Sequence, residues 1–328
     1  MTILEEKVFL SINESRQGMI LTSRDTRNPV LLFLHGGPGS PEVALSGKHP
    51  TGLEDLFTVC WWEQRGAGLS YRRGLSKTTM TIDQMIADTI AVTLYLRQRF
   101  GQARIYLMGH SWGSLLGTLT VSQAPELFKA YIGVGQIVRQ AESERIAYRH
   151  MLDVFRANGD KTMVRRLDKH PIDQGAPIDE GYMMLRSAAL NKLGIGMTRR
   201  PPSMMELPLA LMRCRWYSWP DRLRYVQGMI FSNRCLWSDV LAFDLEAQAP
   251  SLTIPAYIMH GAYDYQVSYD LSRQYAQALV APLKGFYTFR HSAHSPCFEE
   301  PERMCQILRD DVLRGRTELA DPTPDERQ

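Results

Sequence analysis

Gly109-His110-Ser111-Trp112-Gly113 is the most informative motif of the chain and has the form G-x-S-x-G. It follows the apolar run 105–108 and precedes the helix-like run 114–121. A serine on a tight turn between a buried strand and a helix is the arrangement of a nucleophile elbow. The flanking glycines let the backbone pass through the turn, and the N-terminus of the helix favours developing negative charge. The motif therefore predicts that Ser111 is a catalytic nucleophile.

A serine hydroxyl becomes a strong nucleophile when a histidine, oriented by a carboxylate, removes its proton. Asp264 follows the strand-like run 255–259, and His294 follows the strand-like run 285–289. The carboxyl ends of parallel strands meet at one edge of a sheet, so both side chains are expected beside the serine. Ser111, Asp264 and His294 are therefore the predicted catalytic triad.

Neighbouring side chains compete for two of these roles. Asp270 is an alternative carboxylate, and His291 lies three residues before His294. His294 is favoured because it stands in a loop that can reach the serine, whereas His291 emerges nearer the strand. The remaining candidates for the carboxylate, Asp239 and Asp244, do not follow a strand-like run.

The glycine-rich run 35–39, His35-Gly36-Gly37-Pro38-Gly39, follows the apolar run 30–34. Glycines there allow backbone N–H groups to approach a substrate oxygen. Together with the elbow, this run predicts an oxyanion hole formed by the N–H groups of Gly37 and Trp112. Three histidines are expected to make local structural contacts instead: His35, His110 and His260.

A second glycine-containing loop, 63–70, follows the apolar run 57–62. It lacks the G-x-x-x-x-G-K-[ST] form, so nucleotide binding is not expected. We expect Arg65 to act with Glu63 and to brace the loops beneath the active site.

Eight strand-like runs alternate with helix-like segments along much of the chain. They span residues 8–12, 18–22, 30–34, 57–62, 104–108, 130–134, 255–259 and 285–289. The first two suit an antiparallel hairpin, and the continuous apolar runs suit strands covered on both faces. The pattern predicts an α/β fold with a mostly parallel eight-stranded sheet flanked by helices.

Residues 139–250 interrupt this alternation with helix-like sequence. We expect them to form a helical cap inserted into a core made of residues 1–138 and 251–315, with a flexible tail at 316–328. The cap holds nine of the 16 methionines and three of the 6 tryptophans. Such side chains offer an adaptable apolar surface for a bulky substrate. The candidate substrate-binding residues are Trp216, Trp219 and Met229.

The composition of the 328 residues excludes several classes of function. The net charge of +3 gives no reason to expect nucleic acid or an anionic membrane as a partner. The five cysteines are scattered and form no C-x-x-C pair, which indicates neither a disulfide framework nor a zinc site. The N-terminus lacks a signal-like core, and no apolar run reaches about 20 residues. We therefore expect a cytoplasmic protein that acts on a small molecule without a metal ion or cofactor; the oligomeric state stays open.

These motifs resemble those of the α/β-hydrolase superfamily over nearly the whole chain, and those of the proline iminopeptidases within it. The shared features are the run 35–39, Glu63–Gly66 with Gly68 and Ser70, the run 109–114, and His294-Ser295-Pro296 followed by Glu300-Pro301. The resemblance implies an α/β-hydrolase fold and a serine hydrolase. It also implies the triad and oxyanion roles already assigned to the five residues above.

The cap departs from the peptidase pattern. Those enzymes hold the free amino group of the substrate with cap glutamates, one of which follows a tryptophan. Here Pro220 follows Trp219, and the later stretch 228–233 has no glutamate. A buried ammonium group needs a carboxylate partner, so the aminopeptidase reading would need a substitute. The candidates for that substitute are Asp221, Glu206 and Glu180.

A second resemblance points to another substrate. Residues 50–55, 61–68 and 130–136 are similar to a subgroup of bacterial hydrolases that includes serine-dependent macrolide esterases. The resemblance implies hydrolysis of a carboxylic ester or lactone through an acyl-enzyme, with the ring of a macrolide antibiotic as the candidate substrate. The alternatives are a proline iminopeptidase and a non-catalytic binding protein with the same fold.

Overall fold

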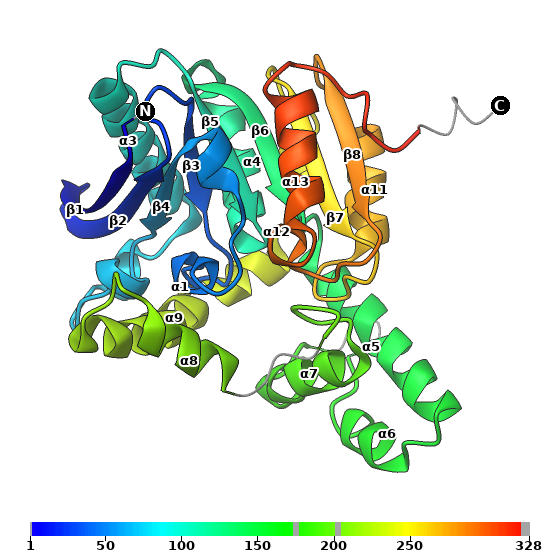
Figure 1. Ribbon diagram of the computed structural model, residues 1–328. Coiled ribbons are helices and arrows are strands. Elements are labelled where there is room, and N and C mark those ends of the chain that lie inside the picture. Colours follow the sequence, from blue (N-terminus) through cyan, green and yellow to red (C-terminus); the bar gives the residue numbers. More distant parts are fainter. Residues whose placement is uncertain (1, 173–176, 201–204, 323–328) are drawn as a thin grey trace.

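The computed structural model describes residues 2–172, 177–200 and 205–322. At its centre lies an eight-stranded sheet in the order β1-β2-β4-β3-β5-β6-β7-β8 (Figure 1). The strands are β1 (Leu4–Ile12), β2 (Ser15–Ser23), β3 (Val30–Leu34), β4 (Thr58–Glu63), β5 (Ile105–His110), β6 (Phe128–Val134), β7 (Ala256–Gly261) and β8 (Lys284–Phe289). β2 pairs antiparallel with β1 and β4, and the other pairs are parallel. The predicted mostly parallel α/β fold is confirmed.

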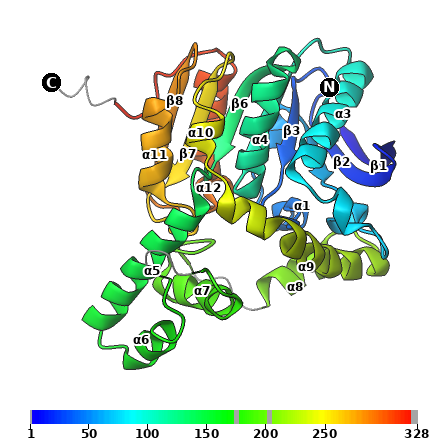
Figure 2. The ribbon, with the colours of Figure 1, turned by 180° about the vertical axis from the view of Figure 1, so that it is seen from behind.

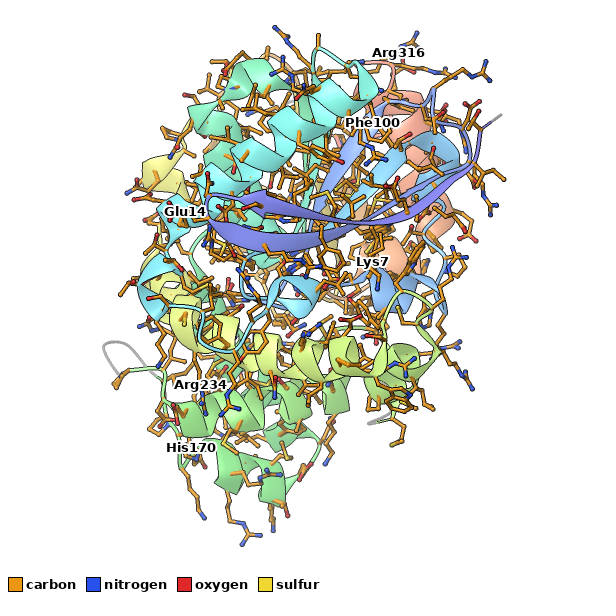
Figure 3. The ribbon with its side chains drawn as sticks, turned by 90° about the vertical axis from the view of Figure 1, so that its left-hand side faces the viewer. Lys7, Glu14, Phe100, His170, Arg234 and Arg316 are labelled. Atoms are coloured by element: carbon orange, nitrogen blue, oxygen red, sulfur yellow. The ribbon has the colours of Figure 1, made fainter. Side chains whose placement is uncertain are left out.

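The first two strands form a hairpin that is longer than its sequence pattern indicated. β1 and β2 pair from Leu4↔Ser23 to Ile12↔Ser15, which leaves a two-residue turn. The turn residues Asn13 and Glu14 have φ angles of 45° and 63°. Positive φ at both positions matches the twist of a two-residue hairpin. Figure 3 shows Glu14 at the tip of this hairpin.

Helices cover both faces of the sheet. One face carries α3 (Ile82–Phe100), α4 (Trp112–Gln123) and α11 (Tyr269–Ala278) (Figure 2). The other carries α13 (Pro301–Ile307), with the short helices α1 (Val43–Ser46), α2 (Leu53–Leu56) and α12 (Pro296–Glu299) near it (Figure 1). In β3, Leu32 and Leu34 enter the first core while Leu31 and Phe33 enter the second. A strand buried on both faces needs such a continuous apolar run.

The chain between β6 and β7 forms helices throughout its described part. These are α5 (Gln140–Ala157), α6 (Lys161–Leu167), α7 (Glu180–Leu193), α8 (Glu206–Arg213), α9 (Trp219–Ala242) and α10 (Leu245–Gln248). Most of them lie beyond one edge of the sheet, as Figures 1 and 3 show. α5, α6 and α7 share a separate apolar core that includes Tyr148, Phe155 and Tyr182. The segment therefore has packing of its own and stands over the edge where the parallel strands end.

Part of the predicted tail 316–328 is held to the core. The N–H groups of Glu318 and Leu319 donate to the Asp311 carboxylate, and the N–H of Asp321 donates to Phe286 O at 2.8 Å. Residues 323–328 lie outside the described residues. Within the described ranges, none of the helices has the length and apolar character needed to cross a membrane.

Candidate active site

Ser111 occupies a strained turn between β5 and α4. Its backbone angles are φ 55° and ψ −121°, a conformation that residues with a side chain rarely adopt. A methyl group on Gly109 would overlap the carbonyl of Gly113, and one on Gly113 would overlap the carbonyl of Leu34. The two glycines are therefore required by close backbone approach, and the turn leaves Ser111 half-buried at the end of the strand.

The loops after β7 and β8 bring Asp264 and His294 together. His294 Nδ1 lies 2.7 Å from Asp264 Oδ2, and both side chains are buried. Asp264 Oδ1 accepts hydrogen bonds from the N–H groups of Gln266 at 2.9 Å and Val267 at 3.0 Å. His260, which is also buried, places its Nε2 3.1 Å from Oδ2. The carboxylate is thus fixed by its own loop through Oδ1, while Oδ2 orients the His294 imidazole and contacts His260.

The competing residues lie elsewhere. His291 is exposed, and its N–H donates to Glu300. Asp270 is exposed in the first turn of α11, and Asp239 is exposed on α9. Asp244 caps α10 by accepting from Ala247 N. None of the four contributes to the described contacts of His294.

The electrostatics of the pair favour a neutral imidazole and an ionised carboxylate. Burial opposes the charge on Asp264, but His294 and His260 outweigh it and hold the pKa of Asp264 below its usual value. Burial lowers the pKa of His294 below 6.5 despite the Asp264 carboxylate, and His110 and His260 lower it further. With the Nδ1 proton directed to the carboxylate, Nε2 of His294 is left as a proton acceptor.

The loops after β6 and β3 each approach the predicted triad closely at a glycine. Gly135 follows β6 with φ 56°, and a Cβ there would lie 3.1 Å from His294 Cε1 and 3.5 Å from Asp264 Oδ2. A Cβ on Gly36 would lie 3.2 Å from Ser111 Cβ. The ends of β3, β5, β6, β7 and β8 therefore converge on one small region of the sheet edge.

The loop after β3 makes a tight turn that requires glycine at its centre. Gly37 has φ 117°, and a Cβ there would lie 2.5 Å from Gly39 N. Within the described part of the chain, no hydrogen bond uses the N–H of Gly37 or that of Trp112. His35 is structural, since its Nδ1 contacts Gly36 O at 2.9 Å and its Nε2 accepts from Gln64 N at 3.1 Å. Burial lowers the pKa of His35 to about 4, so the ring is neutral.

The loop after β4 holds the elbow and the loop after β3 together, but not as predicted. Gln64 accepts from Trp112 Nε1 at 2.8 Å and donates to His35 O at 3.0 Å. The expected partnership of Arg65 with Glu63 is wrong. The Arg65 guanidinium donates to both carboxylate oxygens of Asp88 on α3, at 2.7 and 2.9 Å. The planar guanidinium group matches the geometry of a carboxylate.

Glu63 turns instead toward the cap. Its Oε1 accepts from the Tyr217 hydroxyl at 2.6 Å and its Oε2 from Leu69 N at 2.5 Å. Burial raises the pKa of Glu63 to about 7. Sequence proximity suggested Arg65 as the partner, but the end of β4 points the two side chains to different neighbours.

The cap touches the loops that carry Asp264 and His294. His294 N donates to Gly196 O at 3.2 Å, and Tyr265 N donates to Ile195 O at 3.1 Å. Arg186 of α7 pairs with the buried Glu144 and donates to Gln266 O at 2.9 Å. The segment after α7 therefore borders the site, which the local sequence pattern did not indicate.

The three predicted substrate-binding residues are dispersed. Trp219 is 68% exposed on α9 and lies beneath the Arg222 guanidinium. Met229 is half-buried against the second core, and Trp216 borders a separate cavity. Among the described hydrogen bonds and ring contacts, none joins these side chains to Ser111 or His294.

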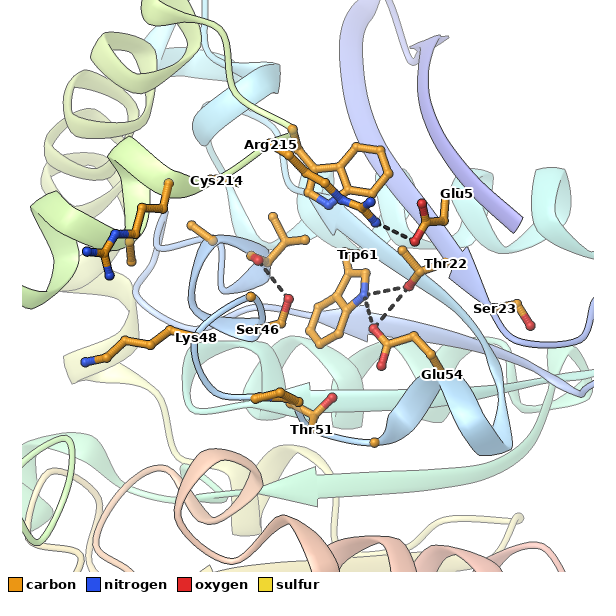
Figure 4. A pocket seen from close by; sticks show the side chains of 18 of the residues that line it. Glu5, Thr22, Ser23, Ser46, Lys48, Thr51, Glu54, Trp61, Cys214 and Arg215 are labelled. Atoms are coloured by element: carbon orange, nitrogen blue, oxygen red, sulfur yellow. Dashed lines mark hydrogen bonds and ion pairs between the residues drawn. The ribbon is translucent and has the colours of Figure 1, made fainter. Parts of the chain in front are cut away.

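That cavity, of about 540 Å³, lies between α1, α2, the hairpin and α8 (Figure 4). Its floor is Trp61, whose Nε1 donates to Thr22 Oγ1 at 3.1 Å and to Glu54 Oε1 at 3.3 Å. Paired charges such as Arg215–Glu5 line its rim. Ser111, Asp264 and His294 are not among the residues that line it, so the predicted triad and this cavity are separate. Within the described residues, no group of three or more His, Cys, Asp or Glu side chains is arranged to hold a metal ion.

A strained serine elbow, a buried carboxylate–imidazole pair and a free glycine loop at the ends of parallel strands define the architecture of an α/β hydrolase. The family model described as "alpha/beta hydrolase fold" matches residues 29–301, and the chain belongs to this family. The chain is 34% identical over 302 residues to the "Probable aminopeptidase YbaC" of Bacillus subtilis (strain 168), covering 91% of this chain and 93% of that protein.

More distant relatives share the fold. The proline iminopeptidase of Heyndrickxia coagulans is 22% identical over 284 residues, which cover 85% of this chain and 89% of that protein. The crystal structure of VinJ has a TM-score of 0.68 at 18% identity and covers 94% of this chain and 98% of that one. The proline iminopeptidase of Mycobacterium smegmatis has a TM-score of 0.67 at 15% identity, with the same coverage.

Proposed function

We propose that the protein is a serine hydrolase that cleaves a carboxylic ester or lactone through an acyl-enzyme. The observation that carries the proposal is the buried Asp264–His294 pair at the same sheet edge as the strained Ser111 turn. The unused N–H groups of Gly37 and Trp112 supply what a developing oxyanion requires.

In this mechanism His294 Nε2 removes the Ser111 hydroxyl proton as Oγ attacks the carbonyl carbon. Gly37 and Trp112 N–H groups stabilise the tetrahedral oxyanion. The intermediate collapses when the protonated His294 gives its proton to the leaving alkoxide and the ester C–O bond breaks, which leaves an acyl-enzyme. The alcohol departs from an ester, whereas in a lactone it stays attached to the acyl chain as a hydroxyl group. Water then attacks the acyl carbonyl while His294 accepts its proton. His294 returns this proton to Ser111 Oγ as the bond between Oγ and the acyl carbon breaks, which releases the carboxylic acid and restores the free serine. Asp264 orients the imidazole and stabilises its charged form throughout.

Two of the three carboxylates named as possible partners of a substrate ammonium already have partners. Asp221 pairs with Lys7 and Arg224 and caps α9 through Ser218. Glu206 pairs with Lys48 and His49. Glu180 is exposed in the first turn of α7, where the helix N-terminus favours its charge. The contacts of Asp221 and Glu206 favour a substrate without a free amine.

An aminopeptidase is the second candidate, because the relatives in Bacillus and Heyndrickxia carry that name. The two functions are separated by three substrates given to one preparation: a prolyl anilide, a short-chain nitrophenyl ester and a 16-membered macrolide. We expect ester and macrolide hydrolysis with little anilide cleavage. Rapid anilide cleavage without turnover of the other two would establish the aminopeptidase instead.

The nucleophile is tested by Ser111→Ala. We expect its ester turnover to fall by about 10⁴-fold or more, because the acyl-enzyme cannot form. Ser122→Ala is the matched control, since Ser122 lies on the same helix α4 and its hydroxyl donates only to Thr118 O. Wild-type turnover in Ser111→Ala would refute the proposed function.

A further inference from the structure

His110 and Glu42 make a buried contact that the proposed chemistry does not use. His110, the last residue of β5, directly precedes Ser111 and is 1% exposed. Its Nδ1 lies 2.7 Å from Oε1 of Glu42, which is also buried, in the segment between the loop after β3 and α1. Its Nε2 lies 2.7 Å from the main-chain oxygen of His294.

The two contacts fix the proton count of the ring. A main-chain carbonyl can only accept, so Nε2 of His110 must carry a proton. The other neighbour is a carboxylate oxygen, so a second proton must lie between Nδ1 and Glu42. The pair therefore holds two protons, and the arrangement is either an imidazolium beside a carboxylate or a neutral imidazole beside a carboxylic acid.

The surroundings favour the charged arrangement. Burial alone would neutralise both groups, but each stabilises the charge of the other, so the pKa of His110 is raised and the pKa of Glu42 is lowered. Glu42 Oε1 also accepts from Gly36 N at 3.1 Å, a bond that favours the carboxylate. Charge interactions couple the pair to five other titratable groups: His35, Asp264, Tyr225, His294 and Cys297.

We propose that Glu42 and His110 form a buried ion pair that positions His294 and the loop after β3 against Ser111. One carboxylate oxygen holds the N–H of Gly36, next to the proposed oxyanion donor Gly37, while the imidazolium holds the main chain of His294. The pair thus joins three loops that are far apart in the sequence. The positioning role rests on the proposed serine hydrolysis, whereas the ion pair itself does not.

The imidazolium also acts on the catalytic base through space. The rings of His110 and His294 have centroids 4.8 Å apart. A positive charge at this distance opposes protonation of His294 and keeps it ready to accept the serine proton. His110 and Glu42 are positioning residues in this account, since neither touches the reacting atoms.

The ion pair is tested without any turnover by nuclear magnetic resonance of wild-type protein labelled with ¹⁵N-histidine. The chain has 8 histidines. We expect one of them to keep both ring nitrogens protonated at about pH 8.5, far above the ordinary histidine value. That signal should disappear in Glu42→Gln and in His110→Gln. Eight neutral rings at that pH in the wild type would overturn the ion pair.

The positioning role is tested by the kinetics of Glu42→Gln. Glutamine can still accept from Gly36 N, but it removes the charge that keeps His110 protonated. We expect kcat for a nitrophenyl ester to fall about 10- to 100-fold with little change in KM. In the profile of kcat/KM against pH, the midpoint of the acid limb should shift to higher pH by about half a unit or more. The reason is that a neutral His110 no longer opposes protonation of His294.

The matched control is Asp179→Asn, which removes the carboxylate from the exposed His170–Asp179 pair of the cap and leaves an N-cap residue in place. It should change neither kcat nor the pH limb. If the midpoint of the acid limb of kcat/KM does not shift in a folded Glu42→Gln protein, the positioning role is overturned. If the wild type shows the doubly protonated ring yet hydrolyses no ester, the proposed function fails while the ion pair stands.

Discussion

Asp264 divides its two oxygens between two tasks, and this division makes the residue hard to replace. Oδ1 holds the loop through Gln266 and Val267, while Oδ2 holds the Nδ1 of His294. Asparagine keeps the size of the side chain but turns one of these acceptors into an N–H₂ donor. The imidazole then loses the acceptor that sets its tautomer.

We predict that Asp264→Asn lowers kcat for ester hydrolysis by about 10³- to 10⁴-fold. Asp270→Asn, which changes the exposed aspartate in the first turn of α11, should retain wild-type kcat. Steady-state kinetics of the two variants distinguish them. A larger loss in Asp270→Asn would show that the wrong carboxylate has been assigned.

His294 is the proposed base, so we expect the pH dependence of activity to follow its ionisation. Burial holds its pKa below the ordinary 6.5, so the neutral, active form persists below that pH. We predict that kcat/KM falls as the pH drops through this lowered pKa, with its midpoint below pH 6.5. A stopped-flow profile with an uncharged ester measures the midpoint. A midpoint at or above 6.5 would contradict the burial and charge environment described for this ring.

At the scale of elements, the turn between β5 and α4 depends on backbone contacts that leave no room for a side chain. We predict that Gly113→Ala lowers the free energy of unfolding by about 3 kcal/mol, because its methyl group would overlap the carbonyl of Leu34. Gly47→Ala is the control. Gly47 has φ −68°, and a Cβ there meets nothing within 4 Å, so alanine should be neutral or slightly stabilising. Urea unfolding gives the free energy of unfolding of both variants. Equal values would show that the turn between β5 and α4 has room for a side chain at residue 113.

The elements also show how far the sequence could be interpreted. Continuous apolar runs such as Val30–Leu34 are typical of strands that are covered on both faces. The positions of the strands along the chain, and the polar residues that follow them, could therefore be predicted. The roles of Glu42, Asp88 and Gly135 could not. Their partners His110, Arg65 and His294 lie far away in the sequence, and no local period encodes a contact between separate loops.

At the scale of the whole molecule, the cap is attached to the core beside the site. Arg186 is one polar link, since its guanidinium pairs with Glu144 of α5 within the cap and donates to Gln266 O of the core, beside Asp264. Both charges are buried, so removing one leaves the other without a partner. The link therefore bears on stability and on the site together.

We predict that Arg186→Met destabilises the protein by about 3–5 kcal/mol and lowers ester turnover. Arg156→Met removes a solvent-exposed pair with Asp168 at 3.5 Å and should cost less than about 1 kcal/mol. Chemical unfolding followed by circular dichroism provides both values. Equal effects would indicate that the buried pair does not secure the cap.

The most direct measurement for the whole molecule is mass spectrometry after treatment with a stoichiometric fluorophosphonate. The reagent phosphonylates an activated serine and releases fluoride, and trypsin should then release residues 105–129, which contain Ser111, Ser114 and Ser122. We predict one adduct per chain, on Ser111, with loss of ester turnover in proportion to labelling and no adduct in Ser111→Ala. An unlabelled Ser111 in protein that still hydrolyses the ester would contradict the account.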